Sequence, residues 1–210
     1  MQILLTVAVP LLLLLTGCMF TTIHMPLPET QRRAIPLHFG LYVTPDSKEN
    51  PIYPPERFTG FHAATDFEVS HEELLQDVPV FAICEGDVMF SGRVEGYGGL
   101  LVQNCEIKGE EVTILYGHVD PADLPKTGVT LSKGQAFAIL GENRSPETDG
   151  NRKHLHLGIH RGPQLSVLGY VQEEEDLKSY MDPEEVLPLL GVTPLMELTP
   201  FWEEEDAVVQ

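Results

Sequence analysis

The chain has 210 residues, 42% of them hydrophobic, and its 32 acidic residues outnumber 13 basic ones to give a formal net charge of −19 at pH 7. This length and apolar content predict one principal domain with a hydrophobic core. The negative charge argues against nucleic-acid binding, because phosphates need a basic surface, and against attachment to anionic lipid through a polybasic patch.

Residues 1–17 are predicted to be a signal peptide. Ile3–Leu15 is an apolar run broken only by one threonine and one proline. As a helix this run would be about 20 Å long, too short to cross a hydrocarbon core of about 30 Å comfortably. It is typical of the apolar region of a secretory signal, although no lysine or arginine precedes it.

The end of this run predicts how the protein is anchored. The residues Leu15-Thr16-Gly17-Cys18 resemble the bacterial lipobox, and that resemblance implies cleavage before Cys18 and a lipid on Cys18. The alternative is an ordinary signal peptide or anchor in which Cys18 has no role. The lipoprotein interpretation predicts an exported protein that is anchored in a membrane and faces the cell wall or periplasm.

The remaining chain divides into three predicted parts. Residues 18–36 contain several prolines and no sustained periodicity, so they are predicted to be a tether. Residues 37–190 form the folded domain. The last twenty residues, 191–210, carry five acidic side chains and no basic one, which predicts an acidic C-terminal tail. The sequence shows no internal repeat and identifies no protein partner.

Short β-rich runs separated by turn residues predict an all-β fold for the domain. No long amphipathic helix interrupts them, so we expect antiparallel sheets that form a sandwich or a partly open barrel. Ser70–Gln76 is predicted to hold one or two helical turns, and Asp182-Pro183 to begin a short C-terminal helix. The runs are Phe39–Thr44, Asp66–Val69, Val78–Cys84, Val88–Val94, Leu100–Ile107, Val112–Tyr116, Ala136–Leu140 and His154–His160.

Two cysteines fall inside the domain. In an exported protein, Cys84 and Cys105 would both lie in a compartment that permits disulfides. A bridge between them and two separately buried thiols are both compatible with the sequence, because strand geometry decides which forms.

The last predicted strand carries alternate histidines. In His154–His160 the residues at 154, 156, 158 and 160 share one face, while Leu155, Leu157 and Ile159 face the core. Neighbouring residues on one face are about 6.5–7 Å apart, so both His154 and His156 can reach one centre. His160 is about 13 Å from His156 and is expected to lie outside that centre.

Two further elements carry candidate site residues. His62 and Asp66 are four residues apart, and they can approach one metal only if the chain bends or makes a helical turn at the small residues between them. His118 follows a β-rich run, in the position where functional side chains gather at strand ends. A set of two or three histidines and one aspartate that leaves one coordination position open is typical of catalytic zinc.

These elements together resemble the M23 family of peptidases, the lysostaphin-like zinc endopeptidases of bacterial cell walls. The resemblance runs in order through most of residues 58–160. It rests on His62-Ala63-Ala64-Thr65-Asp66, Val80–Val88, Gly96–Leu100, Tyr116-Gly117-His118, Lys133-Gly134-Gln135 with Leu140-Gly141, and His154-Leu155-His156-Leu157. The departures are Ala64, where the family often has glycine, and a longer, charged loop at Asp149–Lys153.

The resemblance implies the fold, the cofactor and the site. The fold would be of the M23 type, a duplicated hybrid motif. His62, Asp66 and His156 would hold Zn²⁺, and His118 and His154 would be the catalytic pair, with the sequence leaving open which of them is the base. The substrate would be the stem or cross-bridge peptides of peptidoglycan, and the charged loop bears on specificity.

Three other interpretations remain. The first is a non-catalytic peptidoglycan-binding regulator of other hydrolases, although all five polar positions are present. The second is an exported zinc hydrolase that acts on other peptides. The third is a structural metal site, which is disfavoured because the motifs supply no set of soft cysteine ligands.

Overall fold

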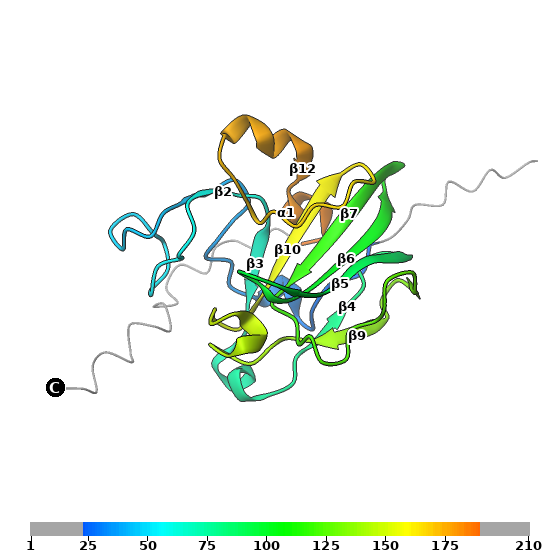
Figure 1. Cartoon of the computed structure of the whole chain (residues 1–210), viewed down its shortest axis with the longest axis horizontal. Helices are drawn as coiled ribbons and strands as arrows, with labels where there is room; N and C mark the ends of the chain where they lie inside the picture. Colours follow the sequence, from blue (N-terminus) through cyan, green and yellow to red (C-terminus); the bar gives the residue numbers. More distant parts are fainter. Residues whose placement is uncertain (1–22, 190–210) are drawn as a thin grey trace, which may run out of the picture.

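The computed structural model describes residues 23–189, and within this range the fold is antiparallel β with few helices (Figure 1). The predicted signal peptide, Cys18 and the predicted acidic tail lie outside the described residues. The strands are β1 (Tyr42–Val43), β2 (Gly60–His62), β3 (Thr65–Glu68), β4 (Pro79–Phe81), β5 (Gly86–Val94), β6 (Gly98–Ile107), β7 (Glu110–Gly117), β8 (Thr130–Leu131), β9 (Ala136–Ile139), β10 (His154–Arg161), β11 (Tyr170–Val171) and β12 (Tyr180–Met181).

The helical elements are short. They are the 3₁₀ helices η1 (Thr30–Arg32), η2 (His71–Leu75), η3 (Pro146–Thr148) and η4 (Glu174–Ser179), and the α-helix α1 (Pro183–Val186). Both predicted helical segments are confirmed: Ser70 and Glu73 form a capping box at the start of η2, and the Asp182 side chain accepts a hydrogen bond from the Glu184 amide at the start of α1. No helix between residues 23 and 189 is both long and apolar enough to cross a membrane.

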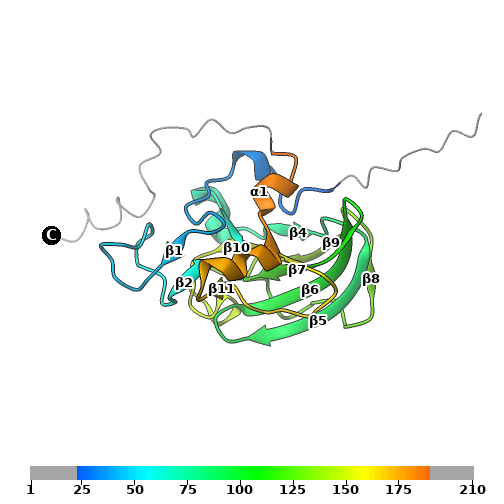
Figure 2. The same cartoon turned by 90° about the horizontal axis from the view of Figure 1, so that it is seen from above.

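A curved, open sheet of seven strands forms the body of the domain (Figure 2). Its order is β12-β10-β7-β6-β5-β8. The seventh strand, β3, pairs with the beginning of β10, and β12 pairs with the end of β10. A three-stranded sheet, β1-β2-β11, and a two-stranded sheet, β4-β9, complete the fold. The predicted antiparallel architecture is therefore confirmed, in its open form and not as a closed barrel.

Tight turns connect the central strands as the glycines predict. The β6–β7 turn places Lys108 and Gly109 at positive φ, as a two-residue hairpin requires. In the β5–β6 turn, Gly98 has φ +72°, and a Cβ there would lie 1.9 Å from the Glu147 carbonyl oxygen. This hairpin packs directly on η3, and because the contact is so close, only glycine fits at that position.

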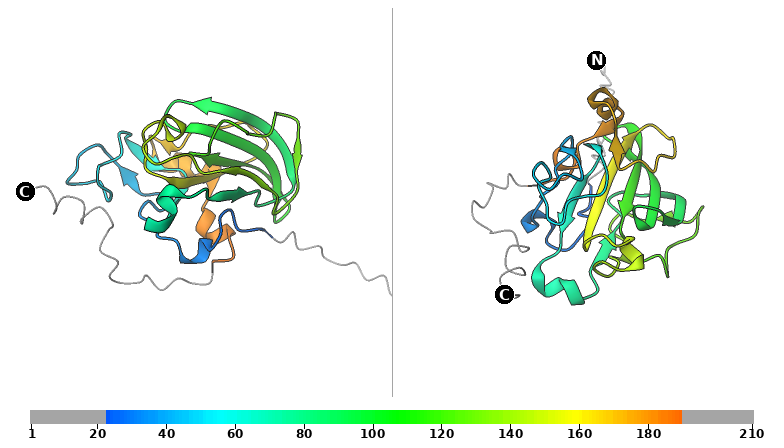
Figure 3. Two further views of the ribbon diagram at one scale, coloured as in Figure 1. Left: turned by 90° about the horizontal axis from the view of Figure 1, so that it is seen from below. Right: turned by 60° about the vertical axis from the view of Figure 1, so that its left-hand side comes forward.

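One face of the large sheet builds the main core. On β10, the side chains of Leu155, Leu157 and Ile159 are fully buried, as the predicted alternation requires. Each such side chain contributes roughly 1.5–3 kcal/mol to stability by leaving water. They pack with β4, β9, the N-terminal segment and α1, which all cover the same face of the sheet (Figures 2 and 3).

The segment from residue 23 to 36, predicted from the sequence as part of a tether, packs against the domain. Leu27 and Thr30 are buried, and the His24 amide donates to the Ile83 carbonyl oxygen at 2.8 Å. Arg33 forms a two-pronged ion pair with Glu73, at 2.7 and 2.8 Å.

Of the two alternatives for the domain cysteines, the structure contains the disulfide, between Cys84 and Cys105. It joins the chain just after β4 to β6. The two residues are 21 positions apart, and closing a loop of that length stabilises a folded state by about 3 kcal/mol in the chain-entropy description.

The predicted first strand, Phe39–Thr44, is mostly wrong. Gly40 has φ +78° and turns the chain, so only β1 remains. The two-residue strands β8, β11 and β12 and the three-residue β2 were not predicted, because such short pairings leave too little alternation in the sequence to detect.

Candidate metal centre and active site

Three strands bring His62, Asp66 and His156 to one point. The β3–β10 ladder sets His156 directly opposite Asp66. His62 ends β2, and the chain bends at Ala63-Ala64 before β3 begins. Ala64 is not among the residues at positive φ, so alanine is unstrained where the M23 motif often has glycine. The bend is what allows residues four apart in sequence to meet.

The three facing atoms form a nearly equilateral triangle. His62 Nε2 lies 3.2 Å from His156 Nδ1 and 3.3 Å from Asp66 Oδ1, and His156 Nδ1 lies 3.0 Å from Asp66 Oδ1. Tetrahedral zinc with bonds of about 2.0–2.1 Å separates its ligand atoms by about 3.3–3.4 Å. The triangle therefore matches one face of a zinc coordination shell, with no fourth protein ligand grouped with it among residues 23–189.

The pKa shifts of Asp66 and His156 and the hydrogen bond of His62 suit a metal. Burial acts to raise the pKa of Asp66, but His154 and His62 outweigh it and hold that pKa well below its ordinary value. Burial lowers the pKa of His156 to about 4 against the opposing effect of Asp66. His62 Nδ1 faces the His38 carbonyl oxygen at 3.2 Å, and donating there leaves Nε2 with a lone pair. One carboxylate and two neutral imidazoles are the species that bind zinc.

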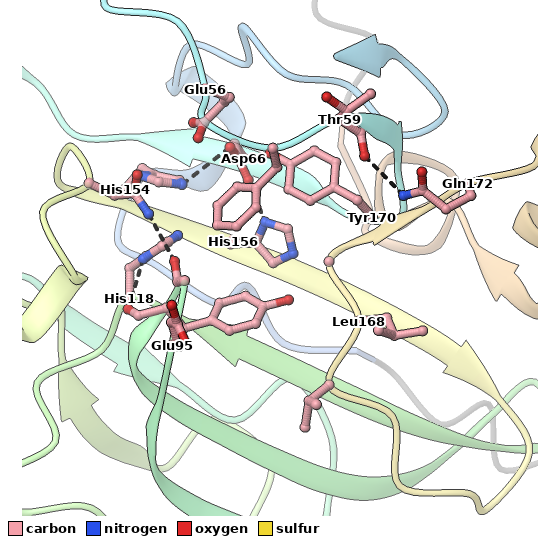
Figure 4. Close-up of a pocket in the computed structure, with 16 residues that line it drawn as sticks. Glu56, Thr59, Asp66, Glu95, His118, His154, His156, Leu168, Tyr170 and Gln172 are labelled. Atoms are coloured by element: carbon pink, nitrogen blue, oxygen red, sulfur yellow. Dashed lines mark hydrogen bonds and ion pairs between the residues drawn. The ribbon is translucent and has the colours of Figure 1, made fainter. Parts of the chain in front are cut away.

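A second pair of histidines lies beside the triangle (Figure 4). The rings of His118 and His154 are 4.3 Å apart between centroids. His118 Nδ1 donates to the Tyr97 carbonyl oxygen and His154 Nδ1 to the Arg152 carbonyl oxygen, both at 2.9 Å. In each ring this leaves Nε2 as the second nitrogen, and that of His154 lies 3.2 Å from Asp66 Oδ2. His118 has φ 62°, an uncommon conformation for a non-glycine residue that is concentrated at functional sites.

The two histidines differ electrostatically. Burial lowers the pKa of His118 well below its ordinary value, and His154 lowers it further. Burial and Arg152 act to lower the pKa of His154, but Asp66, whose Oδ2 lies 3.2 Å from His154 Nε2, outweighs them and raises it.

All five residues belong to one region, and four of them line a pocket of about 270 Å³. Figure 4 shows Glu56 and Thr59 on one side of this pocket and Glu95 on the other, with the histidines between them. No lysine or arginine is among the lining residues. The pocket is lined by Glu56, Phe58, Thr59, Asp66, Glu95, Gly96, Tyr97, His118, Asn151, His154, His156, Val167, Leu168, Gly169, Tyr170 and Gln172.

Two tyrosines pack against the histidines. The centroids of the Tyr170 and His62 rings are 5.2 Å apart, and those of the Tyr97 and His156 rings are 5.3 Å apart. Within residues 23–189, Tyr97 Oη and His156 Nε2 are buried without a hydrogen-bond partner. Both atoms border Gly169, where a Cβ would approach them to 2.4 and 3.0 Å, so glycine keeps this corner open.

The structure thus brings together His62, Asp66, His118, His154 and His156, and leaves His160 apart, against the ring of Tyr180. Sequence reasoning missed Tyr97, Tyr170, Glu56 and Arg152. Arg152 lies in the loop just before β10, in the charged segment that the sequence singled out without assigning it a role at the metal site. The other three come from loops and a short strand that carry no periodic pattern.

A buried set of nitrogen and oxygen ligands with one open corner, on an open antiparallel β domain, defines a zinc-binding protein with the ligand count of a hydrolase. The family model described as "Peptidase family M23" matches residues 60–167, more than half of the chain. The chain therefore belongs to peptidase family M23. Zinc is the cofactor of this family, and His62, Asp66 and His156 are close enough together to bind one ion.

One of the solved structures that match the chain has a TM-score above 0.5 and shares the fold. The SpoIIQ–SpoIIIAH pore forming complex contains a chain that matches with a TM-score of 0.51 at 15% identity, over 81% of this chain and 93% of that one. The catalytic domain of lysostaphin from Staphylococcus simulans matches with a TM-score of 0.48 at 17% identity, over 73% and 90%. Csd3 from Helicobacter pylori matches with a TM-score of 0.44 at 19% identity, over 76% of this chain but only 36% of Csd3. No curated protein matches the chain.

Proposed function

We propose that this protein is a zinc metalloendopeptidase that hydrolyses peptide bonds in the stem or cross-bridge peptides of bacterial peptidoglycan. The observation that carries the proposal is the triangle of His62 Nε2, Asp66 Oδ1 and His156 Nδ1, with no side longer than 3.3 Å, next to a second histidine pair. Membership of the M23 family supports peptidase activity and this class of substrate.

Zinc held by these three residues supplies Lewis-acid activation of a water molecule and polarises the scissile carbonyl. The histidine pair supplies proton transfer. Since His118 and His154 are each fixed through Nδ1, their Nε2 atoms are the ones that take a proton from the attacking water, pass it to the leaving amine and stabilise the oxyanion. The rings of Tyr97 and Tyr170 pack against His156 and His62 and form part of the pocket wall.

The second candidate is a non-catalytic peptidoglycan-binding regulator. It is favoured by the match to a chain of the SpoIIQ–SpoIIIAH pore forming complex, whose title describes an assembly and no hydrolysis. Five buried site residues in mutual contact favour the enzyme, because a binding module has no need of a desolvated carboxylate among four histidines.

Removal of zinc is expected to abolish hydrolysis. Purified protein should clear a peptidoglycan zymogram, lose that activity in a chelator and recover it when zinc is added back. Mass spectrometry of the released muropeptides would identify the bond. Clearing that persists in the chelator contradicts a zinc mechanism, and binding to peptidoglycan without any released peptide identifies the regulator.

We also propose that the protein is exported and held in a membrane by lipid on Cys18. The Cys84–Cys105 disulfide supports this location, since such bonds persist in oxidising compartments. Replacing Cys18 by serine (Cys18→Ser) is expected to move the protein from the membrane fraction to the soluble envelope fraction. Unchanged membrane retention of Cys18→Ser would contradict the lipobox interpretation.

A further inference from the structure

Arg152 joins three carboxylates beside the metal centre. Its Nη2 donates to Asp66 Oδ2 at 2.7 Å and its Nε to Glu68 Oε1 at 2.8 Å, and its Nη1 donates to Glu56. Its side chain is 17% exposed. A planar guanidinium held on three sides has one orientation, so Arg152 is a fixed part of the site.

Strand geometry explains why Arg152 reaches Asp66. The β3–β10 register pairs His154 with Glu68 and His156 with Asp66, so these four side chains share one face of the sheet. Arg152 lies in the loop two residues before His154, and its side chain reaches the two carboxylates on this face, Asp66 and Glu68. The next residue, Lys153, points elsewhere and donates to the Gln76 carbonyl oxygen at 2.6 Å.

The two oxygens of Asp66 face different partners. Oδ1 lies 3.0 Å from His156 Nδ1 and 3.3 Å from His62 Nε2. Oδ2 lies 2.7 Å from Arg152 Nη2 and 3.2 Å from His154 Nε2. A carboxylate can bind a metal through one oxygen or both, and a guanidinium on Oδ2 opposes the second mode.

We propose that Arg152 is a positioning residue that makes Asp66 a one-oxygen ligand and so keeps a coordination position open for the substrate. The inference rests on the proposed zinc site. Arg152 acts at a second point as well, because its carbonyl oxygen accepts the Nδ1 proton of His154 at 2.9 Å. Glu56 and Glu68 hold the guanidinium in place and balance its charge.

The test is metal binding to the folded protein with Arg152→Met. We expect its zinc affinity, measured by competition with a chromophoric chelator, to fall about 10–100-fold, as for loss of other groups that orient a ligand. We also expect weaker visible absorption when Co²⁺ replaces zinc, because a two-oxygen Asp66 raises the coordination number and four-coordinate Co²⁺ absorbs most strongly.

A second variant protects the test against misfolding. Arg152→Met leaves the buried Glu56 and the partly buried Glu68 without their partner. Arg152→Met combined with Glu56→Gln and Glu68→Gln removes those two charges while Asp66 still lacks its guanidinium. We expect the same loss of affinity and of Co²⁺ absorption. Arg33→Met is the matched control: Arg33 is also buried and paired with a glutamate, Glu73, but its hydrogen bonds do not include Asp66, so both readouts should match the wild type.

Wild-type affinity and an unchanged Co²⁺ spectrum in the triple variant would overturn the proposal. So would an equal loss of affinity in Arg33→Met, which would reduce the role of Arg152 to general stability. If the wild-type protein binds neither zinc nor Co²⁺, the proposed function itself fails. Metal binding by the wild type therefore tests the proposed function, and the difference between the wild type and the variants tests this inference.

Discussion

Replacing His156 by alanine (His156→Ala) is expected to abolish both zinc binding and hydrolysis. His156 supplies one corner of the ligand triangle, and the remaining two ligands, His62 Nε2 and Asp66 Oδ1, lie 3.3 Å apart and can hold an ion only weakly. The loss of affinity should exceed the roughly 10–100-fold cost of removing a group that merely orients a ligand. Zinc content after dialysis against a fixed free-zinc buffer measures it.

The matched control for this prediction is His160→Ala. His160 is on β10 and the same face of the strand as His156, but it packs against Tyr180 and does not line the pocket. We expect His160→Ala to keep one zinc per chain and wild-type activity. Stoichiometric zinc in His156→Ala would show that the triangle is not the metal centre.

Replacing His118 by asparagine (His118→Asn) is expected to lower turnover by about 10²–10⁴-fold, the usual contribution of a positioned acid or base, while zinc content stays at the wild-type value. His118 lies beside the ligands but supplies none of the three atoms of the triangle. Asparagine is chosen because it tolerates the positive φ of 62° at this position. Initial rates on purified peptidoglycan and the zinc content of the same sample measure the two effects.

Asp120→Asn controls for disturbance of the loop after β7. Its side chain accepts from the Ala122 amide and does not line the pocket, so this variant should retain activity and zinc. If His118→Asn loses zinc as His156→Ala does, His118 belongs to the metal centre and the proposed division of roles is wrong. If it keeps full activity, the catalytic pair must be sought elsewhere.

Most of the architecture could be predicted because antiparallel strands alternate core-facing apolar residues with residues of the other face, and this alternation is visible in the sequence. Leu155, Leu157 and Ile159 alternate with His154 and His156, and the glycines of the hairpins occupy positions that need positive φ. The missing elements were the very short strands. β11 has two residues, yet it sets Tyr170 opposite His62 and so completes the wall of the pocket.

For the site, the resemblance of its ordered motifs to the M23 family proposed the five polar residues, and the alternation of the last long strand predicted that His154 and His156 share a face. Only the tertiary structure decided that His62 reaches Asp66, that Cys84 joins Cys105, and that Arg152 donates to Asp66 Oδ2. The physical reason is that alternation along a strand is local. The first of these contacts depends on a bend between residues four apart, and the other two join residues 21 and 86 positions apart through loop closure and sheet register.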